Sequence, residues 1–148
     1  MRRAVRALVV HDGHLLVMHR NKFGEQYYTL LGGGVDLGED LVPALMREIQ
    51  EEAGIELASP QLVLVEEAGV PYGNQYIYQC QYVRGTPQLH TDSEEAKIHA
   101  LGQNLYTPMW LPLSELPKVR FRSEKLKQAI LHGLQHGFQQ PPQIIHTA

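Results

Sequence analysis

Apolar and acidic positions separate most clearly between residues 41 and 53. At about 100° per residue, the apolar positions share one side of a helix: Val42, Leu45, Met46, Ile49 and Ala53. Another side carries three acids: Glu48, Glu51 and Glu52. Asp40 is a good N-cap residue, Pro43 is tolerated in a first turn, and Gly54 suits a left-handed C-cap. The pattern predicts a helix from about Leu41 to Ala53.

Strand patterns flank this helix on both sides. Two β-rich runs, at residues 3–10 and 14–20, surround an Asp-Gly pair that favours a tight hairpin. A longer hairpin is predicted from residues 61–70 and 75–84, because the turn cluster Pro71-Tyr72-Gly73-Asn74 lies between them.

The remaining segments predict loops and one more helix. We expect loops at residues 23–28 and 85–107, and Ser123 is expected to cap a final amphipathic helix. Residues 139–148 contain two prolines and are expected to form a loose tail. No repeat or domain boundary is visible, so residues 1–138 are predicted to form one domain of the α+β class.

Composition narrows the class of protein further. The chain has 148 residues, a formal net charge of −3 and no basic stripe, so no nucleic-acid-binding surface is expected. The single cysteine, Cys80, cannot form an internal disulfide and lies in a predicted strand. No segment has the length of a membrane span or the features of a signal peptide, and a cytoplasmic protein without a membrane partner is the expectation.

Glycines immediately precede the predicted helix. A short strand at residues 29–31 is expected to lead into a loop containing Gly32, Gly33 and Gly34. Such a loop lets backbone approach a ligand closely, and a helix N-terminus favours an anion such as phosphate. A tight turn without a ligand is the alternative for glycine runs of this kind.

The acids of the helix repel one another. Glu48 is spaced i,i+3 from Glu51 and i,i+4 from Glu52, so these side chains are neighbours. Arg47 is four residues before Glu51 and can neutralise one carboxylate. The remaining oxygen atoms suit a hard cation, Mg²⁺ or Mn²⁺. A solvated acidic face is the alternative interpretation.

Taken together, these residues match every fixed position of a known signature. Gly33, five residues, Glu39, seven residues and then the run from Arg47 to Ile55 resemble the Nudix box, G-x5-E-x7-R-E-U-x-E-E-x-G-U with U aliphatic. The resemblance implies the Nudix fold, an α/β/α sandwich with a mixed central β-sheet, from Arg3 to about His136. It also implies metal-dependent hydrolysis of a nucleoside diphosphate linked to another moiety, NDP-X, by attack of water on phosphorus.

The same resemblance suggests roles for individual residues. Three acids are implied as metal ligands: Glu48, Glu51 and Glu52. Glu52 or a loop glutamate, Glu94 or Glu95, is the candidate general base. Arg47 is expected to orient Glu51 or another box acid, and Glu39 to support the loop or to bind an outer metal through water. Residues 109–113 resemble the late strand of the family.

Contacts to the substrate are less specified. Backbone groups of Gly32, Gly33 and Gly34 are expected to shape the diphosphate pocket. Arg20 and Arg84 lie near predicted strand ends and are candidate phosphate contacts, and Tyr27 is a candidate for stacking on a base or sugar. For each of these three side chains, ordinary packing or solvation is the alternative.

Two other functions are compatible with the same fold. A regulatory module that binds a nucleotide without catalysis would be expected to lack box acids, and none is missing here. Nudix-like isopentenyl diphosphate isomerases use a catalytic cysteine and extra histidines, and Cys80 has no matching context. Family markers for the substrate conflict, because Pro71 and Tyr72 are adjacent, and many family members are homodimers although no interface is indicated.

Overall fold

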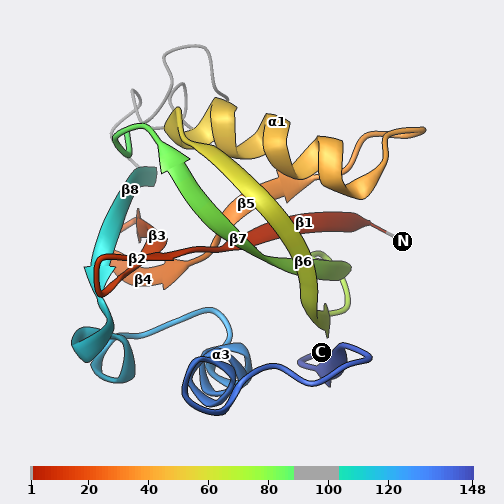
Figure 1. The fold of residues 1–148 in the computed structure, drawn as a ribbon. Coiled ribbons are helices and arrows are strands. Elements are labelled where there is room, and N and C mark those ends of the chain that lie inside the picture. Colours follow the sequence, from red (N-terminus) through yellow and green to blue (C-terminus); the bar gives the residue numbers. More distant parts are fainter. Residues whose placement is uncertain (1, 89–103) are drawn as a thin grey trace.

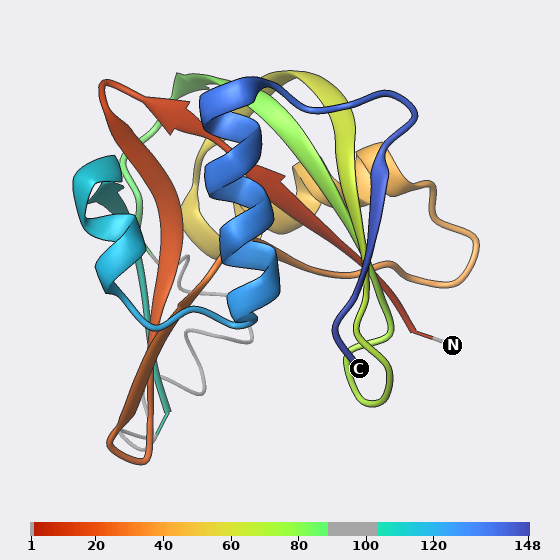
Figure 2. The same cartoon turned by 90° about the horizontal axis from the view of Figure 1, so that it is seen from below.

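The structure is a computed structural model, and it describes residues 2–88 and 104–148. The helices are α1 (Leu41–Ala53), the 3-10 helix η1 (Leu113–Lys118) and α3 (Glu124–His136). The strands are β1 (Arg3–Leu8), β2 (Val10–His11), β3 (His14–Lys22), β4 (Glu25–Thr29), β5 (Leu31–Gly34), β6 (Glu56–Glu67), β7 (Asn74–Arg84), β8 (Asn104–Pro112) and β9 (Gln143–His146). Helices α1 and α3 lie on opposite sides of the strands (Figures 1 and 2).

The strands form two sheets. The larger has the order β5-β1-β7-β6-β9, in which β1 pairs with β7 in parallel and with β5 antiparallel. The smaller contains β2, β3 and β4, with β8 paired antiparallel to β3. The expected mixed sheet between helices is therefore confirmed. Strand β5 is the last strand before α1, and residues 35–40 connect the two elements.

Each side of the larger sheet has its own apolar core. Leu45 and Ile49 of α1 are fully buried in a cluster that includes Val5 of β1. Ile130 of α3 and Leu8 of β1 belong to the second cluster. Alternating residues of one strand thus serve both cores, and each fully buried Leu or Ile contributes about 1.5–3 kcal/mol. These contacts fix α1 against β1 and β5.

The local signals at the two helices are confirmed, with one exception. Helix α1 has the predicted bounds, and Gly54 adopts the left-handed conformation with φ 66°. Ser123 accepts a hydrogen bond from the Leu126 backbone N–H at 3.2 Å. Asp40 occupies the N-cap position of α1, but its side chain makes no capping hydrogen bond.

Several loop predictions are wrong. Residues 25–29 form β4, which pairs with β3 so that Tyr27 lies opposite Arg20. The glycines expected in a loop belong to strand β5, with Gly32 opposite Arg6 and Gly33 opposite Val5. Residues 104–107 of the expected long loop belong to β8. In each case pairing with a strand distant in sequence overrides a local composition typical of loops.

The C-terminal segment also differs from the expected loose tail. Residues 143–146 form β9, which pairs in parallel with β6, so that Ile144 lies opposite Val65. The Thr147 backbone N–H donates to the Glu67 carbonyl at 3.0 Å. Within residues 2–88 and 104–148, none of the helices is long and apolar enough to cross a bilayer.

Candidate active site

Three acids of α1 face a cavity, and they differ in burial. We call Glu48, Glu51 and Glu52 the acidic wall, since all three line this cavity. Glu52 is only 4% exposed. The Glu48 side chain is 13% exposed and the Glu51 side chain is 51% exposed. The alternative of a solvated acidic face therefore does not describe Glu48 and Glu52.

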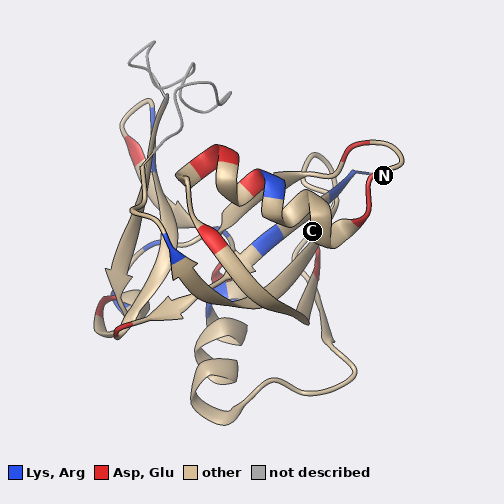
Figure 3. Ribbon diagram, turned by 45° about the horizontal axis from the view of Figure 1, so that its top comes forward, with Lys and Arg blue, Asp and Glu red and all other residues tan. Residues whose placement is uncertain are grey.

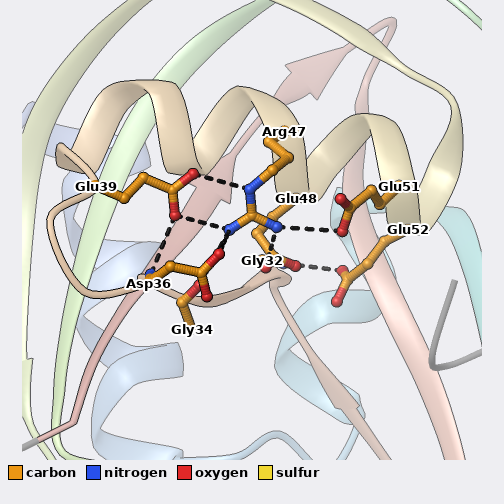
Figure 4. A network of polar contacts seen from close by, with 8 residues as sticks. All are labelled: Gly32, Gly34, Asp36, Glu39, Arg47, Glu48, Glu51 and Glu52. Atoms are coloured by element: carbon orange, nitrogen blue, oxygen red, sulfur yellow. Dashed lines mark hydrogen bonds and ion pairs between the residues drawn. The ribbon is translucent and has the colours of Figure 1, made fainter.

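Arg47 connects the acids to the segment before the helix (Figure 4). Its guanidinium donates from Nε to Glu39 Oε2 at 2.8 Å and from Nη2 to Glu39 Oε1 at 2.9 Å. Nη1 donates to Glu48 Oε1 at 3.0 Å and to Glu51 Oε2 at 3.2 Å. Nη2 also lies 3.6 Å from Asp36 Oδ2. One cation is thus shared by four carboxylates, and the planar fork of arginine suits this arrangement.

The ionisation of Glu39 follows from these bonds. The hydrogen bond from Arg47 and the Asp36 backbone N–H together lower the pKa of Glu39 to about 2. The same bond to Glu39, followed by the charge of Glu48, raises the pKa of Arg47 above its usual value. The Asp36 N–H lies 3.1 Å from Glu39 Oε1. Glu39 therefore closes the turn before α1 and is positioned by Arg47.

The glycines of β5 bring backbone against the acids. The Gly32 N–H donates to Glu52 Oε2 at 3.0 Å. Gly32 has φ 149°, and a Cβ there would overlap the Val5 carbonyl of β1. A Cβ on Gly33 would instead overlap the Glu48 carboxylate. Glycine is required at both positions because β5 lies too close to the β1 backbone and to the Glu48 side chain to leave room for a Cβ.

Arginines line the opposite side of the cavity. Arg2 and Arg6, from the N-terminal segment and β1, lie there with Arg20 of β3, and we call these three the arginine wall. Arg6 Nε donates to Gln75 Oε1 at 2.9 Å, and Arg20 Nη2 donates to the Tyr106 hydroxyl at 2.6 Å. Figure 3 shows acidic positions on α1 and basic positions on strands beneath it. The cavity has a volume of about 380 Å³.

A larger cavity, of about 840 Å³, lies between α3 and strands β6 and β9. Residues His132 and Phe138 help to line it, and no residue of α1 does. The acidic wall therefore lines the smaller cavity, which we take as the candidate active site.

The sequence-predicted residues are distributed unevenly around this site. Gly32, Gly33, Gly34 and Arg20 line the cavity with the acidic wall. Tyr27 does not line it, although its ring centroid lies 5.6 Å from the Arg20 guanidinium carbon.

Two other sets of predicted residues lie away from the described cavity. Arg84 is at the end of β7, where Nη2 lies 2.9 Å from Glu56 Oε1. Glu94 and Glu95 lie outside the described residues.

Sequence reasoning missed Arg2, Arg6 and Tyr106. The available signal was a charged residue, Arg6, inside an otherwise apolar strand pattern. A buried cation in a strand indicates that an anion or a polar partner lies nearby. Arg2 and Tyr106 carry no comparable local signal, because only the fold brings them to this cavity.

The donor types of the acidic wall fit a divalent cation. Carboxylate oxygens are the ligands that Mg²⁺ and Mn²⁺ prefer, and three carboxylates line one side of the cavity. Within residues 2–88 and 104–148, no three acidic, histidine or cysteine groups converge on one point.

Comparisons with known proteins agree on one family. The NUDIX domain matches residues 1–130 of this chain. Among curated proteins, the NAD-capped RNA hydrolase NudC of Edwardsiella ictaluri is 30% identical over 74 residues, which are 50% of this chain and 29% of that protein. The NudC protein of Stutzerimonas stutzeri is 27% identical over 78 residues, 53% of this chain and 28% of that protein. The chain thus spans less than a third of the length of these relatives.

Solved structures show the same fold. A MutT NUDIX hydrolase from Burkholderia pseudomallei superposes with a TM-score of 0.66 at 24% identity, covering 85% of this chain and 94% of that one. A NUDIX hydrolase from Nitrosomonas europaea has a TM-score of 0.71 at 17% identity, covering 93% and 90%.

Proposed function

The chain belongs to the NUDIX hydrolase family, and from this premise we propose that it is a metal-dependent pyrophosphohydrolase that cleaves NDP-X. The observation that carries the proposal is the cavity in which the acidic wall of α1 faces arginines from the strands. A diphosphate is strongly anionic, and cations held by the acidic wall would compensate the charge of the linkage that is cleaved.

The reaction adds water across one P–O–P linkage. A bond forms between the water oxygen and phosphorus, the bridging P–O bond breaks, and its electron pair leaves with the departing phosphate. The water proton passes to a carboxylate, for which Glu52 or a loop glutamate, Glu94 or Glu95, is the candidate. A divalent cation, Mg²⁺ or Mn²⁺, would supply neutralisation of phosphate charge and a lower pKa of water.

The residues have separate tasks in this proposal. Glu48, Glu51 and Glu52 would hold the cation. Arg47 orients Glu48 and Glu51 through the bonds described above and does not contact substrate. Glu39 accepts two hydrogen bonds from Arg47 Nε and Nη2. This bidentate pair orients the guanidinium so that Nη1 can donate to Glu48 and Glu51.

The burial of Cys80 argues against the isomerase alternative. Cys80 lies in the apolar cluster beneath α1, and burial raises the pKa of its thiol to about 12. A protonated thiol is a poor acid–base or nucleophilic group at neutral pH. The regulatory alternative is disfavoured because every acid of the box is present and three line one cavity.

A substrate panel tests the proposal. The purified protein with Mg²⁺ or Mn²⁺ is given nucleoside triphosphates, UDP-glucose, ADP-ribose, NAD and NAD-capped RNA, the last because the relatives are named for it. Mass spectrometry identifies the products, and isotopically labelled water shows which phosphorus is attacked. Metal-dependent cleavage of a diphosphate linkage, absent in Glu52→Gln, is expected. Binding without turnover across the panel would instead favour a regulatory module.

A further inference from the structure

The arginine wall lacks the carboxylate partners that two half-buried arginines of this protein, Arg47 and Arg122, have. Arg2 is exposed, and Arg6 and Arg20 are half-buried. Arg47 forms ion pairs with four carboxylates, and Arg122 lies 3.1 Å from Glu66, which is fully buried. Among the described residues, no carboxylate lies within ion-pair distance of Arg2, Arg6 or Arg20. Three cations thus share one cavity wall without an anion of this part of the chain bound to them.

Arg20 shows the consequence most clearly. Its guanidinium carbon lies 4.3 Å from the centroid of the Tyr106 ring. Its Nε is buried and, within residues 2–88 and 104–148, has no hydrogen-bond partner. A buried guanidinium nitrogen without an acceptor is costly, and Arg20 therefore retains unused hydrogen-bonding capacity for an anion.

Arg6 is affected by the same arrangement. Burial, together with the charges of Arg2, Arg122 and Arg20, lowers its pKa, and the charge of Glu52 only partly offsets this. Arg6 Nη1 reaches the Leu30 carbonyl at 3.4 Å. A neutral acceptor solvates the guanidinium but does not cancel its charge, so mutual repulsion within the wall persists until an anion binds.

The cavity offers little to a nucleobase. Tyr106 is the only aromatic residue among the described residues that line it, and Arg20 already covers its ring. Recognition by the described lining of this cavity therefore acts on charge and not on base stacking. A nucleotide would insert its phosphates here.

We propose that the arginine wall is a subsite for a phosphate beyond the diphosphate that the acidic wall serves. The preferred substrates are then nucleotides with three or more linked phosphates. This inference rests on the proposed function, and hydrolysis remains the addition of water across one P–O–P bond. A nucleotide sugar or ADP-ribose, whose X ends in an uncharged sugar, leaves the arginine wall without an anion.

Substitution of Arg20 tests this subsite. In Arg20→Gln, kcat/KM for a nucleoside triphosphate is expected to fall about 10- to 100-fold, as loss of a charge-assisted hydrogen bond predicts. The value for UDP-glucose should change less than about threefold, and Arg20→Lys should recover part of the loss for the triphosphate. Arg3→Gln is the matched control, because Arg3 is an exposed residue of the same β1 strand as Arg6 and does not line the cavity.

A binding measurement separates this inference from the proposed function. Inorganic tripolyphosphate is titrated calorimetrically into the wild-type protein and into Arg20→Gln and Arg2→Gln without divalent metal. Weaker binding to both variants than to wild type and Arg3→Gln supports the subsite even if no substrate is hydrolysed. Equal binding of tripolyphosphate to all four proteins overturns the subsite. An equal loss of kcat/KM for the triphosphate and for UDP-glucose in Arg20→Gln also overturns it, but leaves the proposed function intact.

Discussion

The acidic wall and the arginine wall face the same cavity but are built in different ways. The acidic wall comes from five consecutive residues of one helix, and its neutralising cation, Arg47, comes from the same turn. The arginine wall is assembled from an N-terminal segment and two strands, and among the described residues it has no carboxylate partner. Hydrogen bonds to Arg47 hold the acidic wall in place, whereas the arginine wall gains its counter-charge only from a bound anion.

This difference suggests a division of labour. A wall whose geometry is fixed by internal hydrogen bonds can position a reactive centre in the same way for every substrate. A group of arginines without carboxylate partners among the described residues favours ligands that carry more negative charge. Changes in the acidic wall should therefore alter turnover for all substrates, and changes in the arginine wall should alter the ratio between substrates.

Glu52→Gln should have the largest effect. It removes a buried charge that the proposed cation requires, and turnover is expected to fall by about 10³-fold or more for every substrate. The amide oxygen can still accept the Gly32 N–H bond, so the fold should persist. Steady-state kinetics with two substrates and circular dichroism check both statements.

A surface acid provides the control for that substitution. Glu56→Gln removes an exposed carboxylate that pairs with Arg84 away from the cavity, and its turnover should remain close to wild type. Near wild-type turnover of Glu52→Gln itself would contradict the assignment of the acidic wall.

Arg47→Met separates the two walls more sharply. Losing the bonds to Glu39, Glu48 and Glu51 should reduce kcat about 10- to 100-fold for all substrates at saturating metal, as is typical when partners of metal ligands are removed. Arg20→Met removes the same charge from the opposite wall, and its loss should depend on the substrate. Equal losses across substrates for both variants would mean that the walls do not have separate tasks.

Gly33→Ala should give a smaller effect on the acidic wall. The added Cβ meets the end of the Glu48 side chain, so the carboxylate must move while the backbone stays. A loss of about tenfold in kcat with an unchanged melting temperature is expected. Gly34→Ala is a comparison within the same cavity: its Cβ would lie 3.7 Å from Arg2 Nη2, an ordinary contact, and would have no Glu48 atom among its nearest neighbours. If both alanine variants lost activity equally, displacement of Glu48 would not be the cause.

The two walls also differ in what the sequence reveals. The bounds of α1 and its acids follow from periodicity, proline and glycine within one short stretch, and such local signals need no knowledge of the fold. Arg2 and Arg20 reach the cavity only through the pairing of β1 with β5 and of β3 with β8. No local pattern encodes these contacts.

The glycines illustrate the same limit within the box. Their composition predicted a loop, but the register that places Val5 opposite Gly33 makes them a strand. The Glu52 bond to Gly32 could not be predicted either, since it depends on how closely α1 crosses β5. The sequence therefore predicts which acids line the site, but it does not predict that the glycines form a strand in close contact with β1 and α1.

The smallest expected effect concerns the pH dependence of the pair formed by Glu39 and Arg47, which supports the acidic wall. The pKa of Glu39 is lowered from 4.5 to about 2 in the folded protein. Because the folded pKa is depressed, the stabilisation from Glu39 is fully present above about pH 4.5 and is lost as pH falls toward about 2. Glu39→Gln lacks this contribution at every pH. Its melting temperature should lie below that of wild type at neutral pH, and the gap should close between about pH 4.5 and 2. Thermal unfolding of both proteins across this range measures the gap, and a gap independent of pH would show that the Arg47 bond does not depend on the charge of Glu39.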